Sequence, residues 1–417
     1  MKIQIKNEPI IFDNKDFQTI LIKVYFPFHR NEEDIAKLSL LPSLLNYVCE
    51  KYPTEEEFMV ACQKNFILSN FCSSTSLGDT NFITFSFCIP DTYTLDKKFI
   101  EEQFKIFHEM MYHPKTNYHQ FPKKEFEREL ENIKNGISKV LKNVDSYATI
   151  KAKELVDDQN LLSSTIYNHL DQIDLLNENS LYEFYQEKVI NNQPMIYLFG
   201  NMNHKEITEL CKKYLYLREF KNTEIEINQY NYLKVREEVK EIKEQSSFHN
   251  SIYMNFYKVK NMQRKDEIYL GLLTELLSSS TSRILQKKLR DESNLVYSTV
   301  AFNYSNYGLL GTSSSINKEN IIEVKKKIDE AFKELTKIKK IDTLLKRIKE
   351  KHRINLIRLQ DKKGSLFSDY IRKETGIDIT SEEYYKEILP ITAKDINKFL
   401  KRLQLDSTYF LEEGEHE

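Results

Sequence analysis

Leucines recur at steps of three and four residues in two stretches of the chain, residues 34–45 (DIAKLSLLPSLL) and 266–277 (DEIYLGLLTELL). This spacing puts the leucines on one face of an α-helix, so each stretch is predicted to be a helix packed on a core. The two stretches align residue for residue, and each begins with an aspartate. The match indicates an internal repeat.

The elements around the two leucine helices follow the same order in both halves. Each half opens with an apolar, β-branched run, and a second amphipathic stretch, two β-like runs and charged helices follow the leucine helix. This order predicts an α+β fold of two duplicated domains, each a mainly antiparallel sheet with helices packed on one face. A polar, charge-rich stretch predicts the join: domains 1–215 and 246–417, with a linker at 216–245.

Composition argues against several classes of protein: nucleic-acid-binding, nucleotide-binding, secreted and membrane-spanning. Lys plus Arg (61) nearly cancels Asp plus Glu (63), so no global field favours nucleic acid or an anionic membrane. Only nine glycines occur, and no phosphate-binding loop or dinucleotide motif is found. No secretory signal or membrane-spanning apolar run is visible, and the five cysteines lack metal-binding spacing. These features predict a cytoplasmic protein with reduced thiols.

The segment LRDESNLVYS in the second half places Arg290 seven residues before Tyr297. It resembles the Leu-Arg … Leu-Gly-Tyr segment of the insulinase-type (pitrilysin-like, or inverzincin) metallopeptidases and of mitochondrial processing peptidase. The resemblance implies that Arg290 and Tyr297 line a cleft and bind substrate, holding the scissile carbonyl near a metal. Taken alone, the spacing also fits a structural role, since Arg suits a helix C-terminus and Tyr suits a strand.

The leucine helix of the first half is where this family carries its metal-binding His-x-x-Glu-His. The corresponding residues here are Ser39, Pro42 and Ser43, so the motif is degenerate. In a working motif two histidines hold zinc from one helix face and the glutamate activates a metal-bound water. The resemblance puts the third ligand, a glutamate, near Glu129 or Glu131, but one carboxylate does not make a zinc site. We therefore expect no metal and no catalytic residue in this chain alone.

A second histidine-rich segment, HEMMYH, contains His108 and His113. Five residues of straight helix turn the second ring about 140° from the first, so we expect that the two cannot share a metal. The apolar stripe of this helix also predicts that His108 faces solvent.

The resemblance implies a non-catalytic subunit of a heterodimeric bacterial processing peptidase. Its partner would be a homologous chain with an intact His-x-x-Glu-His that holds the zinc, and its substrate would be a peptide. By analogy with bacterial relatives, the peptide could be a modified one such as a bacteriocin precursor. The alternative is a metal-free peptide-binding or scaffold protein of the same fold without protease activity. A third option is a metalloenzyme with other ligands.

Overall fold

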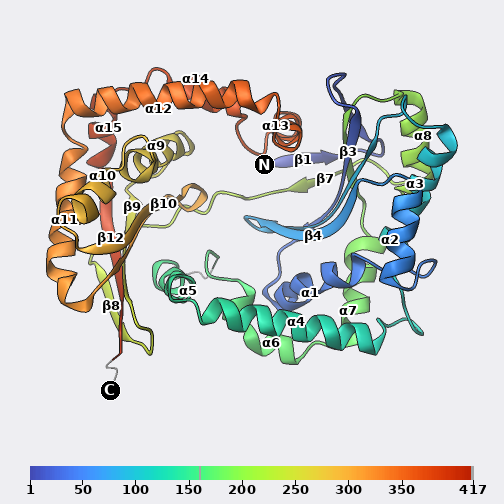
Figure 1. Ribbon diagram of the computed structural model, residues 1–417, viewed down its shortest axis with the longest axis horizontal. Helices are drawn as coiled ribbons and strands as arrows, with labels where there is room; N and C mark the ends of the chain where they lie inside the picture. Colours follow the sequence, from blue (N-terminus) through green and yellow to red (C-terminus); the bar gives the residue numbers. More distant parts are fainter. Residues whose placement is uncertain (159–160, 415–417) are drawn as a thin grey trace. The chain divides into compact units, whose positions relative to one another are not determined.

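The computed structural model describes residues 1–158 and 161–414 (Figure 1). Proximity of Cα atoms divides the chain into two compact units, each built from three segments of the sequence. Unit 1 contains Met1–Ile137, Thr165–Gln229 and Asp361–Ile379; unit 2 contains Ser138–Ser164, Tyr230–Gln360 and Thr380–Glu417. The domains predicted from the sequence, 1–215 and 246–417, remain a prediction. Residues 415–417 of the second domain lie outside the described residues.

Unit 1 is built on a five-stranded sheet. The strands of this unit are β1 (Lys2–Ile5), β2 (Ile10–Asp13), β3 (Thr19–His29), β4 (Ser69–Leu77), β5 (Thr80–Pro90), β6 (Met195–Gly200) and β7 (Thr223–Glu226). The sheet has the order β2-β6-β3-β5-β4, so β4 is an edge strand, while β1 pairs with β7. All pairs in the sheet are antiparallel except β2 with β6. This mainly antiparallel sheet is the one the sequence predicts.

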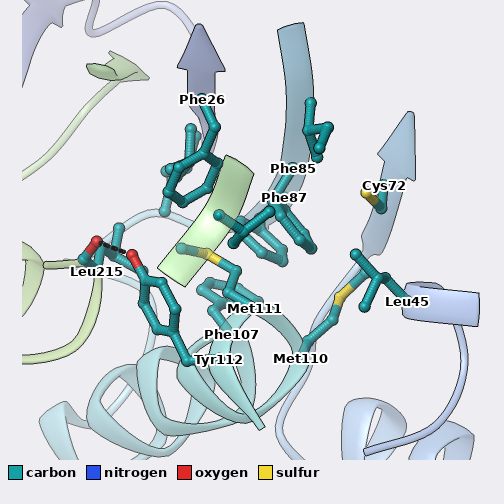
Figure 2. Packing of buried hydrophobic residues seen from close by; sticks show 14 of the residues in the cluster. Phe26, Leu45, Cys72, Phe85, Phe87, Phe107, Met110, Met111, Tyr112 and Leu215 are labelled. Carbon is teal, nitrogen blue, oxygen red and sulfur yellow. Dashed lines mark hydrogen bonds between the residues drawn. The ribbon is translucent and has the colours of Figure 1, made fainter. Parts of the chain in front are cut away.

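Helices of unit 1 cover the sheet with aromatic and aliphatic side chains. On α3 (Lys97–Tyr112), the ring of Phe107 stacks on Phe87 of β5 with centroids 3.9 Å apart (Figure 2). The buried hydroxyl of Tyr112 donates to the carbonyl of Leu215 at 2.7 Å, which satisfies a polar group inside this core. The other helices are α1 (Ile35–Leu45), α2 (Glu55–Lys64), α4 (Lys123–Leu141), α6 (Leu170–Asp174), α7 (Glu178–Tyr185), α8 (His204–Tyr214) and α13 (Lys363–Thr375), with short turns at Glu32–Asp34, Ile166–Asn168 and Gln186–Ile190.

Unit 2 repeats this sheet. Its strands are β8 (Lys240–Gln245), β9 (Ser251–Val259), β10 (Val296–Tyr304), β11 (Leu309–Ile316) and β12 (Leu403–Glu412). The order is β10-β11-β9-β12-β8, which matches unit 1 strand for strand and includes one parallel pair, β12 with β8, at the same place. The shared order confirms the predicted two-sheet α+β fold.

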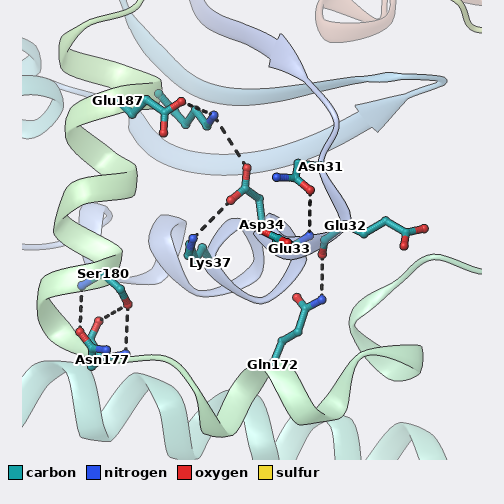
Figure 3. Close-up of polar contacts among 10 residues, drawn as sticks. Asn31, Glu32, Glu33, Asp34, Lys37, Gln172, Asn177, Ser180 and Glu187 are labelled. Atoms are coloured by element: carbon teal, nitrogen blue, oxygen red, sulfur yellow. Dashed lines mark hydrogen bonds and ion pairs between the residues drawn. The ribbon is translucent and has the colours of Figure 1, made fainter.

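The leucine helices confirm the repeat in detail. Helix α1 follows a short turn that ends at buried Asp34, and α9 (Glu267–Ser278) follows a turn that ends at buried Asp266. Lys37 and Lys188 neutralise Asp34 at 3.4 and 3.8 Å in unit 1 (Figure 3), and Arg402 binds Asp266 with two nitrogens in unit 2. The other helices of unit 2 are α5 (Val144–Val156), α10 (Ile284–Gln286), α11 (Ile321–Glu334), α12 (Ile338–Leu359), α14 (Ser381–Ile388) and α15 (Ala393–Leu400), with short turns at Arg264–Asp266, Lys287–Asp291, Ser305–Tyr307 and Lys318–Asn320.

One helix of each unit comes from the opposite half of the sequence and lies on the second face of the sheet. In unit 1, Phe367 of α13 stacks on Phe199 of β6 at 5.6 Å. In unit 2, Ala148 and Ala152 of α5 join the core formed by β9 and β12. The sequence did not predict this exchange.

Lys363, at the start of α13, gives unit 1 a pH dependence that can be measured. Its ammonium donates to the carbonyl and hydroxyl of Thr19, and burial lowers its pKa from 10.5 to about 8. Between these two pH values the unfolded chain holds a proton that the folded chain has released, so this group makes stability rise with pH. The stability of Lys363→Met relative to the wild type should therefore be greater near about pH 7.5 than near about pH 9.5.

Urea unfolding at the two pH values measures this difference. Lys362→Met, which removes an exposed neighbouring charge, serves as the matched control and should show little change with pH. An offset between Lys363→Met and the wild type that does not change with pH would contradict the assigned burial of the ammonium.

Candidate functional site

The degenerate metal motif lies on an intact helix. Ser39, Pro42 and Ser43 all fall within α1, as predicted. The Ser39 hydroxyl donates to the carbonyl of Ile35 at 2.8 Å, one turn earlier on the same helix. Pro42 is buried, and its ring removes the backbone donor that a glutamate would supply at this position. These three side chains offer neither zinc ligands nor a general base.

The expected third ligand is also engaged elsewhere. On α4, the Glu129 carboxylate pairs with Arg128 at 2.8 Å and accepts from Asn132 at 3.3 Å, while Glu131 is exposed. Within residues 1–158 and 161–414, no group of three or more His, Cys, Asp or Glu side chains could hold a metal ion.

Asn46, directly after α1, lies at the β4 edge of the unit 1 sheet. Its carboxamide nitrogen donates to the carbonyl of Cys72 at 3.2 Å, and its oxygen accepts from the N–H of Cys72 at 2.6 Å. Cys72 lies in the middle of edge strand β4, so the side chain takes the place of a neighbouring strand at that residue. The same carboxamide also caps α1 by donating to the carbonyl of Pro42 at 2.9 Å. A peptide could not pair with β4 at Cys72 without displacing Asn46.

Replacing Asn46 by alanine should therefore destabilise unit 1. The change leaves the N–H and C=O of buried Cys72 without partners, which we expect to cost about 1–3 kcal/mol of unfolding free energy. Urea unfolding measures the loss. Asn65→Ala is the matched control, since that carboxamide donates to the carbonyl of Ala61 on its own helix at 2.8 Å, and its loss should cost less. Equal losses for both variants would contradict the role assigned to Asn46.

Arg290 and Tyr297 both lie in unit 2, where the structure leaves them exposed. Arg290 belongs to the short turn Lys287–Asp291 that follows α10, and its side chain is exposed. Tyr297 lies near the start of edge strand β10 with 59% of its side chain exposed, and its hydroxyl donates to Asn317 at 2.8 Å. Exposure leaves both residues available to a ligand.

Tyr297 occupies a β-bulge that periodicity along the sequence does not reveal. Val296 pairs with Ile316 and Ser298 pairs with Ser315, so Tyr297 has no partner residue on β11. Bulges re-aim a side chain relative to its sheet and are common next to binding sites. Tyr297 therefore lies exposed on an edge strand and has no cross-strand partner.

The predicted geometry of His108 and His113, with rings turned apart and His108 facing solvent, was wrong. Their Nε2 atoms lie 3.3 Å apart, and His108 is half-buried, with Nδ1 2.8 Å from the carbonyl of Tyr214. The helical rotation argument fails because α3 ends at Tyr112. His113 has φ −127° and ψ 56°, which swings its side chain back over the last turn.

Comparisons with known proteins support the resemblance. The model of the family described as peptidase M16 inactive domain matches residues 176–351. The chain is 21% identical over 407 residues to the "probable inactive metalloprotease YmfF" of Bacillus subtilis (strain 168), covering 96% of this chain and 94% of that protein.

No helix in the described part of the chain is both long and apolar enough to cross a bilayer.

Two solved structures share the fold. A conserved protein from Enterococcus faecalis V583 superposes with a TM-score of 0.84 at 19% identity and covers 100% of both chains. A peptidase M16 inactive domain from Pseudomonas fluorescens gives 0.72 at 12% identity, covering 98% of this chain and 96% of that one. The family model over residues 176–351 and the Bacillus subtilis protein support the resemblance of this chain to the insulinase-type, or M16, metallopeptidases, and the two solved structures show that it shares their fold.

Proposed function

We propose that this protein is the non-catalytic subunit of a heterodimeric zinc metallopeptidase that processes peptides. Its partner is a homologous chain with an intact His-x-x-Glu-His, which supplies the zinc. Arg290 and Tyr297 orient an extended peptide and help polarise its scissile carbonyl. The observation that carries the proposal is the contrast between a motif helix with no ligand and an Arg/Tyr segment that is exposed and bulged outward.

The proposal places the peptide on unit 2, at edge strand β10. Extended peptides dock by adding a strand to a sheet edge, where main-chain hydrogen bonds supply affinity. Edge strand β4 is closed at Cys72 by Asn46. On edge strand β10 the N–H of Ala301 donates to the Ser278 hydroxyl of α9, so a peptide would pair with the part of β10 before Ala301, where Tyr297 and Val300 are exposed. A peptide paired with β10 would run past the Tyr297 hydroxyl.

The experiment compares three samples: this chain alone, a homologous chain bearing His-x-x-Glu-His alone, and their mixture. Cleavage of unstructured peptides is followed with and without a chelator. We expect no cleavage by this chain, and we expect the mixture to be faster than the partner alone and sensitive to the chelator. Chelator-sensitive cleavage by this chain alone would overturn the proposal.

The alternative, a metal-free peptide-binding or scaffold protein, has its own outcome in the same experiment. It predicts that the chain retains peptides or forms a stable homodimer, while the mixture cleaves no faster than the partner chain. Size-exclusion chromatography of the chain alone and of the mixture separates the two functions.

A further inference from the structure

We propose that His108 and His113 form a binding site for a divalent transition-metal ion, Zn²⁺ or Ni²⁺, at the end of α3. This site lies in unit 1, shares no residue with the degenerate motif on α1 and takes no part in peptide hydrolysis. It is independent of the proposed function.

The distance between the two rings suits a shared ion. A zinc ion with tetrahedral ligands and Zn–N bonds of about 2.0–2.1 Å holds two nitrogens about 3.3–3.4 Å apart. The Nε2 atoms of His108 and His113 are 3.3 Å apart. A direct N–H···N hydrogen bond prefers a shorter distance and rings in line. Here the ring planes meet at 52° and the centroids are 5.1 Å apart, closer than rings in line would be at this nitrogen distance.

The hydrogen bond of His108 presents the correct nitrogen to the metal. A backbone carbonyl only accepts hydrogen bonds, so the Nδ1 that lies 2.8 Å from the Tyr214 carbonyl must carry the proton. In the neutral ring the lone pair then lies on Nε2, facing His113. Histidine ligands of metals commonly donate their other ring nitrogen to a carbonyl in this way, which sets both the tautomer and the ring orientation.

The surroundings favour an exchangeable ion held partly by water. Both rings are half-buried, so solvent reaches them, and imidazole nitrogens suit Zn²⁺, Ni²⁺ and Cu²⁺. The described residues place no third His, Cys, Asp or Glu ligand at this point, so water would complete the coordination. His108 already links α3 to the C-terminal end of α8 through its hydrogen bond to Tyr214. The bound ion would add a link from His108 to His113, the residue just after α3.

Titration of the full chain, without an affinity tag, with ZnCl₂ or NiCl₂ alone tests the site by calorimetry. The wild type should bind about one ion, and His113→Ala should weaken binding at least tenfold, since losing even an outer-shell partner of a metal costs about 10–100-fold. His113 suits the test because, among the described residues, its side chain hydrogen-bonds and makes ring contact with His108 alone. His204→Ala removes an exposed histidine elsewhere in unit 1 and should bind like the wild type.

A second readout is thermal stability. The metal should raise the Tm of the wild type and of His204→Ala but not that of His113→Ala, because the ion binds the folded state. The proposal is overturned if the wild type takes up no ion, or if His113→Ala binds and is stabilised as the wild type is. Neither result depends on cleavage of any peptide.

Discussion

Replacing Arg290 by alanine should slow peptide cleavage by the proposed heterodimer roughly ten- to thousandfold, by analogy with the loss of a donor to a developing oxyanion, which costs about 100- to 1000-fold. The guanidinium is always charged and presents several donors in a fixed plane, so it can hold a carbonyl that gains negative charge. Its exposed position in unit 2 leaves it free for that role. Because such a contact strengthens in the transition state, kcat and kcat/KM should fall together.

Tyr297→Phe should lower turnover within the same range, because it removes only the hydroxyl and keeps the ring on the bulge. Two matched variants act as controls. Lys287→Ala removes an exposed positive charge from the same turn as Arg290, and Tyr304→Phe removes a hydroxyl from the far end of β10. Steady-state kinetics of mixtures containing each variant give the comparison. Unchanged turnover for Arg290→Ala and Tyr297→Phe would remove the role assigned to them.

Replacing Asp406 by alanine should cost unit 2 about 3–5 kcal/mol of unfolding free energy, as expected when one partner of a buried ion pair is removed. Asp406 is fully buried, and its carboxylate binds Arg236 at 2.6 Å and Lys258 at 3.1 Å. Lys258 is only 2% exposed, and burial already lowers its pKa, an effect that the nearby Asp406 opposes. Without Asp406, two buried or half-buried cations would face each other with no carboxylate between them.

Thermal and urea unfolding measure this loss, and Asp406→Asn, which preserves the shape, should also destabilise. The control is Glu382→Ala on α14. It breaks the Lys386–Glu382 pair, in which both side chains are about two-thirds exposed, so we expect a change within about 0.5 kcal/mol. A loss at Asp406 as small as that of the control would show that the buried network contributes little.

Much of the fold was predictable because it follows from local periodicity. The leucines at three- and four-residue steps predicted α1 and α9, and the residue-for-residue match of 34–45 with 266–277 predicted the repeat of the sheets. The degenerate motif was equally accessible, since the identities of Ser39, Pro42 and Ser43 exclude zinc ligation whatever surrounds them.

Other features depend on residues far apart in the sequence. The sequence does not show that α5 and α13 each cover a sheet formed by the opposite half of the chain. Asn46 bonds Cys72, 26 residues later in the sequence, and no pattern in either segment predicts that contact. The bulge at Tyr297 arises from the register between β10 and β11, which alternation along one strand cannot show.

By itself the sequence determined that this chain has two related α+β halves and that its motif helix lacks zinc ligands, because side-chain identity and helical period are local properties. Only the tertiary structure decided which residues cover the sheet edges and which side chains contact one another. It closed β4 with Asn46, turned Tyr297 outward and brought His108 and His113 together beyond the end of α3. Those outcomes depend on backbone direction at helix ends and on strand register, which the whole fold sets.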